Sequence, residues 1–185
     1  MIKTSQFIWL KLKVEYFTNI FIEIKKLLWD KEKEILEFQN PLSLHITVYY
    51  LPWKTTEIEE KEIKDIIEKF SQQKIKISMK KLEYFWDNIA YISYDNFENL
   101  EKINNFLKSK FIDYNSIVDN SYSHFIPHTT LFKIKDYPKF LQYKNDIENI
   151  VVKNIEKIQK SDFIENFHLY AVNSTFTPEL QVIIY

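Results

Sequence analysis

Two short segments of the chain place a threonine two residues after a histidine within apolar, β-branched surroundings. The first is SLHITVYY, which holds His45 and Thr47, and the second is FIPHTTLFKI, which holds His128 and Thr130. Alternate residues of a β-strand share one face, so each histidine is expected to project beside its threonine. Imidazole transfers protons near neutral pH, and a hydroxyl group donates hydrogen bonds to anionic oxygens. Two such pairs facing each other supply a base, an acid and two donors, a set that suits displacement at phosphorus.

In that chemistry one imidazole accepts the proton of the attacking oxygen and the other protonates the leaving oxygen. Each proton transfer typically contributes about 10²–10⁴-fold to the rate. The scheme requires no metal and no cofactor, and we expect none. A single histidine in such a strand is more simply read as a core residue with one hydrogen-bond partner. The repetition of the same pair in two strands argues against that interpretation for the pair.

Composition indicates a globular protein of one domain. The chain has 185 residues, of which 45% are hydrophobic, so we expect a single domain over residues 1–185, built of two lobes that share a core. Cysteine is absent, which is compatible with a reducing cytoplasm. Lys11 and Lys13 interrupt the apolar run at the N-terminus, so we expect neither a signal peptide nor a membrane span there. A cytoplasmic location is the resulting expectation.

Two compositional absences exclude whole classes of phosphate site. The chain contains no glycine, which rules out Gly-rich phosphate loops of the Walker or Rossmann kind. All 25 basic residues are lysine, so no arginine is available for bidentate phosphate binding. The formal net charge of −1 does not indicate a general attraction to polyanions, and most Lys-rich stretches are mixed with acids, as solvated faces are.

Hydrophobic periodicity predicts a mixed α+β chain in which a helix precedes each His-x-Thr strand. Helices are predicted over residues 14–28, 58–70 and 97–107 and within 137–160. Strands are predicted over residues 5–13, 42–51, 74–86, 89–94 and 124–134 and near 162–173 and 180–185, with a hairpin turn at Asp87–Asn88.

Several residues around the two pairs are candidates for substrate contact. Strict alternation puts Tyr49 on the face of His45 and Thr47, where it either stacks on a base or packs at the sheet edge. The same alternation puts the core side chains at Leu44, Ile46, Val48 and Tyr50.

Trp53 and His124 are further candidates. Trp53, at the end of the first His-x-Thr strand, is a second candidate for stacking on a base. His124 is expected to lie in a loop, and it is a candidate for substrate contact or else a plain loop residue. His124 precedes His128 by four residues, the spacing of helical zinc ligands, but Pro127 argues against a helix there, so we expect no metal site.

At these residues the chain resembles the two-histidine phosphoesterase superfamily, which includes bacterial 2′-5′ RNA ligases and 2′,3′-cyclic phosphodiesterases. The segments LHITVYYL and PHTTL match its two motifs, and the closing segments FHLYAVNS and PELQVIIY match its last strand pair. The resemblance implies a bilobal α+β fold with a cleft between two antiparallel-rich sheets and helices packed outside. It implies that His45, Thr47, His128 and Thr130 form the catalytic set.

The sequence departs from that pattern at two places. Pro52 stands where a glycine is common, and Lys133 stands where a basic residue, often arginine, follows the second motif. Strict alternation turns Lys133 away from His128, so a phosphate contact by this lysine requires the strand to bend.

The expected function is metal-independent phosphodiester chemistry on a 2′,3′-cyclic phosphate or a 2′-5′ linkage in RNA or a nucleotide. Partners are then RNA ends or small cyclic nucleotides and oligonucleotides, with no membrane, no obligate protein partner and a monomeric state. One alternative is degradation of cyclic or 2′-5′-linked oligonucleotide second messengers, and another is a non-catalytic module that binds RNA ends or nucleotides. The loops at residues 53–57 and 113–123 are expected to determine the substrate specificity.

Overall fold

The computed structural model describes the chain in several ranges with gaps between them. These ranges are residues 6–51, 61–62, 65–66, 68–70, 74–75, 77–112, 124–159, 165–166 and 169–173. Trp53, the loops at 53–57 and 113–123, and the strand predicted at 180–185 lie outside the described residues. Of the helix predicted over 58–70, the described residues are helical.

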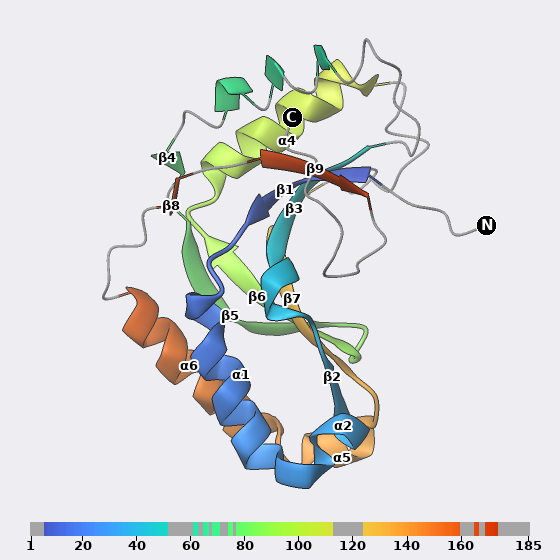
Figure 1. The fold of residues 1–185 in the computed structure, drawn as a ribbon, viewed down its shortest axis with the longest axis vertical. Helices are drawn as coiled ribbons and strands as arrows, with labels where there is room; N and C mark the ends of the chain where they lie inside the picture. The colour runs from blue at the N-terminus through green and yellow to red at the C-terminus, as the bar shows by residue number, and fades with distance from the viewer. Residues whose placement is uncertain are drawn as a thin grey trace, which may run out of the picture.

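The first sheet is antiparallel and has the strand order β3-β1-β9 (Figure 1). Its strands are β1 (Gln6–Lys11), β3 (His45–Leu51) and β9 (Leu169–Asn173). Helix α4 (Glu98–Lys110) packs against β3 and buries the apolar positions Leu100, Ile103 and Leu107. The first His-x-Thr pair therefore lies on an edge strand of this sheet, supported by α4.

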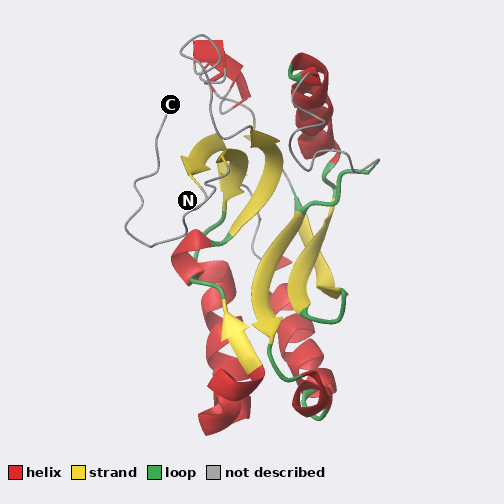
Figure 2. Ribbon diagram, turned by 90° about the vertical axis from the view of Figure 1, so that its right-hand side faces the viewer, coloured by secondary structure: helices red, strands yellow, loops and turns green. Residues whose placement is uncertain are grey.

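The second sheet is also antiparallel and has the strand order β2-β7-β6-β5. Its strands are β2 (Leu36–Phe38), β5 (Ser78–Phe85), β6 (Ile89–Asp95) and β7 (His128–Ile134). Helix α6 (Lys144–Gln159) packs on β5, and α1 (Glu15–Leu28) packs on α6, so both helices cover the outer side of this sheet (Figure 2). A short ladder joins β4 (Lys74–Ile75) to β8 (Glu165–Asn166).

The two sheets meet where β3 and β7, the strands that carry the His-x-Thr pairs, contact each other. Behind them a single core of buried side chains joins both lobes, with Ile8 and Ile46 from the first sheet and Ile92 and Phe132 from the second all at 0% exposure. Burial of this apolar surface holds the two strands in a fixed relation. The α+β class and the two-sheet arrangement expected from the sequence are confirmed.

Helix α1 shows why the amphipathic prediction succeeded. Its buried residues recur three or four positions apart, which places them on one stripe of the helix. They are Phe17, Ile20, Phe21, Ile24 and Leu28. Glu15 lies in the first turn, and Lys25 and Lys26 lie near the last, as the helix dipole favours.

Several element boundaries differ from the prediction. The strand predicted over 74–86 is divided into β4 and β5, which belong to different sheets. The helix predicted within 137–160 is two helices, α5 (Tyr137–Leu141) and α6. The strand predicted over 124–134 begins only at His128, after Pro127, which lacks the N–H that a ladder needs. A short helix α2 (Glu32–Ile35), strand β2 and the 3₁₀ turns at Trp29–Lys31 and Pro41–Ser43 were not predicted.

The β5–β6 hairpin turns one residue earlier than predicted. The Asn88 amide donates to the Phe85 carbonyl at 3.1 Å, so the central residues are Trp86 and Asp87, with φ of 47° and 59°. Positive φ at both central positions defines the type I′ class of turn, which normally uses asparagine and glycine. A chain without glycine adopts it here with a bulky tryptophan, at a cost in backbone strain.

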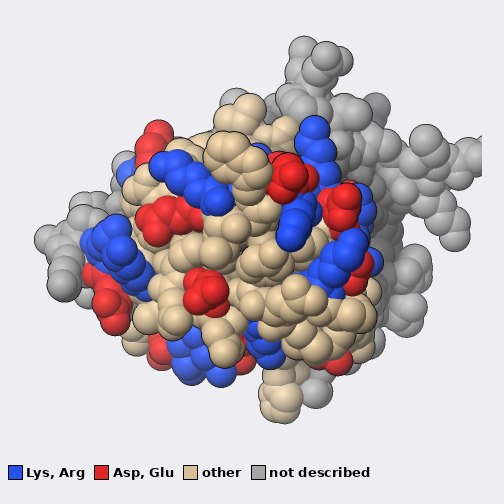
Figure 3. Space-filling view, turned by 90° about the horizontal axis from the view of Figure 1, so that it is seen from below, with Lys and Arg blue, Asp and Glu red and all other residues tan. Residues whose placement is uncertain are grey.

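The face of the molecule seen in Figure 3 carries lysine and acidic side chains interspersed. Ion pairs between such side chains are found in the described residues; for example, the Lys139 ammonium of α5 contacts Glu34 at 3.1 Å and Asp136 at 3.3 Å. Interspersed acidic side chains limit the attraction of this face for polyanions. In the parts of the chain that the structure describes, no helix has the length and apolarity needed to cross a bilayer.

Candidate active site

The two histidines are held in the same way by main-chain carbonyls two residues upstream. His45 Nδ1 lies 2.6 Å from the Ser43 carbonyl oxygen, and His128 Nδ1 lies 2.9 Å from the Ile126 carbonyl oxygen. A carbonyl only accepts hydrogen bonds, so Nδ1 carries the proton in both rings. Each neutral imidazole therefore has its lone pair on Nε2, the nitrogen left for proton transfer.

An aromatic side chain supports each imidazole from the neighbouring strand. Trp9 of β1 pairs with Thr47, and its ring meets the His45 ring edge-on at 4.6 Å. Tyr91 of β6 pairs with Thr130, and its ring meets the His128 ring edge-on at 5.4 Å. In each pair, the aromatic residue opposite the threonine thus restricts the orientation of the histidine ring that lies two positions before that threonine.

Each His-x-Thr segment is followed at once by a β-bulge. In β3, Thr47 pairs with Trp9 and Tyr49 pairs with Ile8, so the residue between them is the extra one. In β7, Thr130 pairs with Tyr91 and Phe132 pairs with Ala90, again with one extra residue between them. A one-residue bulge reverses the alternation of side chains beyond it.

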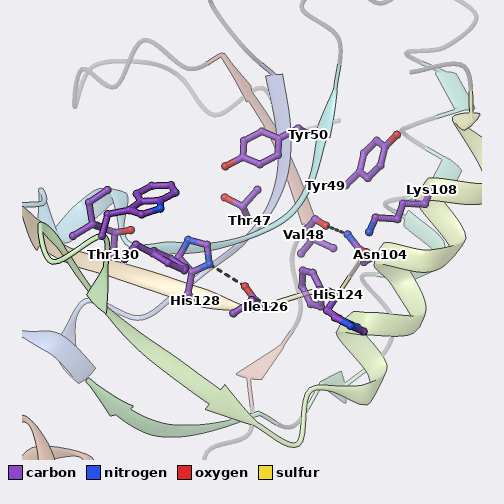
Figure 4. Close-up of a pocket in the computed structure, with 14 residues that line it drawn as sticks. Thr47, Val48, Tyr49, Tyr50, Asn104, Lys108, His124, Ile126, His128 and Thr130 are labelled. Carbon is purple, nitrogen blue, oxygen red and sulfur yellow. Dashed lines mark hydrogen bonds between the residues drawn. The ribbon is translucent and has the colours of Figure 1, made fainter. Parts of the chain in front are cut away.

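The bulge in β3 exchanges the expected environments of two tyrosines. Tyr49 is 1% exposed, with its ring against Phe111 and its hydroxyl donating to the Phe111 carbonyl at 3.4 Å. Tyr50, which strict alternation assigned to the core, is 36% exposed, so that assignment was wrong. Figure 4 shows Tyr50 directed to the side of Thr47 and Tyr49 directed away toward Lys108. Leu44, Ile46 and Val48 are buried as expected.

The bulge in β7 brings Lys133 to the face of the site. Lys133 pairs with Ile89, and residues directly opposite each other in an antiparallel ladder share a face. Ile89 lines the cavity described below. The strand therefore bends in the way that a phosphate contact by Lys133 requires. Lys133 itself is exposed and lies outside the lining of the cavity, and Glu37 is opposite it on β2.

A cavity of about 410 Å³ lies between the two sheets and helix α4. Its described lining brings together Thr47, His128 and Thr130 of the predicted catalytic set, and Tyr49 and His124 of the predicted substrate contacts. Most of the remaining wall is aromatic or aliphatic. It consists of Val48, Tyr50, Phe85, Trp86, Ile89, Phe125 and Ile126, together with the polar Asn104 and Lys108. His45 is partly buried two residues before Thr47 and lies outside this lining.

Burial lowers the pKa of both imidazoles. The pKa of His45 is lowered to about 4, chiefly because the ring is removed from water. The Ser43 carbonyl raises this pKa, and the charge of a protonated His128 lowers it. Burial likewise lowers the pKa of His128, against the raising effect of the Ile126 carbonyl. The strands that carry the two rings, β3 and β7, contact each other.

Sequence reasoning missed the residues that brace the site. Phe85 stacks on Tyr91 with ring centroids 4.0 Å apart and meets the His128 ring edge-on at 5.0 Å. Asn104 of α4 is 4% exposed and donates from Nδ2 to the Val48 carbonyl at 2.6 Å, which fixes the bulge next to Thr47. The one sequence signal for Asn104 was its place among the apolar positions of the predicted helix, which indicated that its side chain faces the core. Within the described ranges, no cluster of three or more His, Asp or Glu residues has the geometry to hold a metal.

Two solved structures share this fold. TT0787 of Thermus thermophilus matches with a TM-score of 0.57 at 15% identity, over 71% of this chain and 75% of its own. ATU0111 of Agrobacterium tumefaciens strain C58, a conserved protein of unknown function, matches with a TM-score of 0.58 at 13% identity, over 100% of this chain and 86% of its own. The class that they define is the two-histidine phosphoesterase-like fold.

The sequence supports a narrower placement. Residues 4–177 match the family described as the AKAP7 2′5′ RNA ligase-like domain, and the chain belongs to that family. No curated protein sequence matches the chain.

Proposed function

We propose that the protein is a metal-independent phosphodiesterase that acts on 2′,3′-cyclic phosphates or 2′-5′ phosphodiester linkages of RNA or nucleotides. The observation that carries the proposal is the matched design of the two His-x-Thr segments. Each has an Nδ1–H held by the carbonyl two residues upstream, an aromatic residue opposite the threonine, and a bulge directly after it. A structural role alone gives no reason for this repetition on two contacting strands.

The reaction follows from the two Nε2 atoms. The attacking oxygen of water or a neighbouring hydroxyl bonds to phosphorus while one imidazole takes its proton. The bond from phosphorus to the leaving oxygen breaks, and the other imidazole gives that oxygen a proton. The strongly lowered pKa of His45 suits it to the base and leaves His128 as the acid. Thr47 and Thr130 donate to the phosphoryl oxygens, at about 1.5–3 kcal/mol for each charge-assisted bond.

The experiment is turnover of 2′,3′-cyclic nucleotides and 2′-5′-linked dinucleotides in EDTA. We expect His45→Ala and His128→Ala each to lower kcat by about 10²–10⁴-fold. The double variant should lose little more than either single one, because the two imidazoles act in one step. Thr47→Ala and Thr130→Ala should also lower kcat, and Thr18→Ala, on the exposed side of α1, is their matched control.

Two results would contradict the proposal. One is activity in either histidine variant equal to that of the wild type, with thermal unfolding unchanged. The other is tight binding of cyclic nucleotide that is recovered intact after long incubation, which would make the protein a binding module.

A further inference from the structure

The cavity is bordered by an exposed tryptophan that the proposed reaction does not use. Trp86, in the turn between β5 and β6, lines the cavity together with His128 and Thr130 and is 80% exposed. Tyr50 and Ile126, which also line the cavity, are 36% and 53% exposed. Exposed large apolar side chains that gather around one cavity are typical of a ligand-binding surface, whereas a single one on an open face is not.

One aromatic side chain connects Trp86 to His128. The centroid of the Phe85 ring lies 5.9 Å from that of Trp86 and 5.0 Å from that of His128. The Phe85 ring also stacks on Tyr91 at 4.0 Å, which holds it in place. The indole of Trp86 is therefore close enough to His128 for one small molecule to contact both.

The backbone of the turn gives no reason for a tryptophan at this position. Trp86 has a φ of 47°, a conformation that glycine, asparagine and aspartate adopt at lower cost. Trp29 has a similar φ of 49° and is 78% exposed, but it lies outside the described lining of the cavity. Its place beside the cavity is thus what distinguishes Trp86, and Trp29 provides a matched control.

We propose that Trp86 stacks on the base of the nucleotide whose phosphate binds beside His128 and Thr130. An exposed indole face stacks on any nucleobase and stabilises the complex without hydrogen bonds. In a nucleoside 2′-phosphate or 2′,3′-cyclic phosphate, the base and the phosphate are attached to neighbouring ribose carbons, so one cavity of about 410 Å³ accommodates both. The substrate class is then a nucleotide and not a sugar phosphate without a base. This inference rests on the function proposed above and names the residue that selects for a base.

Equilibrium binding measures the contribution of the base without turnover. Calorimetry compares adenosine 2′-monophosphate with methyl β-D-ribofuranoside 2-phosphate, in which a methoxy group replaces the adenine. The wild type should bind the adenosine compound about 5- to 100-fold more tightly, which is the range for one stack of a base on an aromatic side chain. Trp86→Leu should remove most of this preference, and Trp86→Phe, which keeps a smaller ring, should retain part of it.

Two further variants separate the loss of stacking from a loss of structure. Trp86→Asn introduces a side chain that tolerates positive φ, so the variant should unfold at or above the wild-type temperature and still lose the preference. Trp29→Leu removes a tryptophan of equal exposure and similar φ away from the cavity, and it should keep the preference.

Equal affinities of the two ligands in the wild type would overturn the inference. A preference that survives Trp86→Asn in full, or one that Trp29→Leu removes equally, would also overturn it. Turnover of adenosine 2′,3′-cyclic phosphate separates the inference from the proposed function. Turnover with the same KM in the wild type and in Trp86→Asn refutes the stacking and leaves the phosphodiesterase. No turnover, together with a base preference that depends on Trp86, refutes the phosphodiesterase and leaves the stacking site.

Discussion

Lowering the pH should separate the behaviour of the free enzyme from that of its substrate complex. The mechanism needs one neutral and one protonated imidazole, but burial lowers the pKa of His45 to about 4 and also lowers that of His128. The maximum of kcat/KM, which reports the free enzyme, should therefore lie between about pH 4 and the ordinary histidine value of about 6.5. A bound anionic phosphate favours the imidazolium form, so the kcat profile should lie about 1–3 pH units higher.

The same shift predicts how stability depends on pH. An unfolded histidine titrates at about 6.5, whereas folded His45 titrates at about 4. Between those values the unfolded chain binds a proton that the folded chain does not, so the free energy of unfolding falls as the pH is lowered. At about 1.4 kcal/mol for each pH unit, the loss from His45 between these two pKa values is at most about 3.5 kcal/mol. Solvent screening of the partly exposed ring reduces it.

NMR of histidine-labelled protein measures the titration directly. Comparison with His45→Asn and His128→Asn assigns the two signals, and urea unfolding at pH 7, 6 and 5 measures the loss of stability. A His45 signal that titrates at 6.5 or above would refute the reasoning, and so would a kcat/KM maximum above pH 7. Either result would mean that burial does not determine the protonation of this site.

Three substitutions test the surroundings of the site. Asn104→Leu should lower the free energy of unfolding by about 1–3 kcal/mol in urea titrations, because the buried Val48 carbonyl loses its donor. Phe85→Leu should lower kcat with KM unchanged in steady-state assays, because the His128 ring loses an edge contact worth about 0.5–1.5 kcal/mol. Lys133→Gln should raise KM by up to about fivefold with kcat unchanged, because the phosphate contact predicted for Lys133 would be made by an exposed charge.

Each of these substitutions has a matched control. Asn105→Leu changes the exposed neighbour on the same helix and should leave stability nearly unchanged, whereas an equal loss would remove the special role of Asn104. Phe85→Tyr keeps the aromatic ring and should retain the wild-type kcat. A kcat as low as that of Phe85→Leu would contradict the supporting role of the ring. Lys81→Gln changes an exposed lysine on β5 and should leave KM unaltered; an equal rise in KM would indicate a general charge effect.

The sequence predicted the parts of the fold that depend on periodicity. Helix α1 and strands β1 and β6 carry long, regular apolar patterns, and each lies where it was expected. Strand β2 was missed because three residues directly after a helix give no period to detect. The break between α5 and α6 was missed because no proline or glycine marks the turn near Gln142.

The two His-x-Thr pairs were visible in the sequence, whereas their surroundings were not. Two histidines with threonines at the same offset are a local pattern, and the structure brings both strands together. The bulges that bury Tyr49 and turn Lys133 are a property of two paired strands, so one strand read alone does not reveal them. Asn104 and Lys108 reach the cavity from a helix more than fifty residues away in sequence from Thr47, beyond any local pattern.

The absence of glycine has a consequence for the unfolded chain. Average proteins contain about 7% glycine. Replacing a glycine at a compatible position lowers the conformational entropy of the unfolded chain and thereby stabilises the fold by about 0.4–1 kcal/mol. This chain instead places non-glycine residues at positive φ, with Trp29, Trp86, Asp87 and Asn96 doing so within the described ranges. Each of these residues with positive φ carries backbone strain on the order of 1 kcal/mol in the folded state. Trp86 and Asp87, two of these residues, directly follow Phe85, whose ring contacts the His128 ring. Part of the backbone strain of the fold therefore lies in the hairpin turn next to the residue that supports His128.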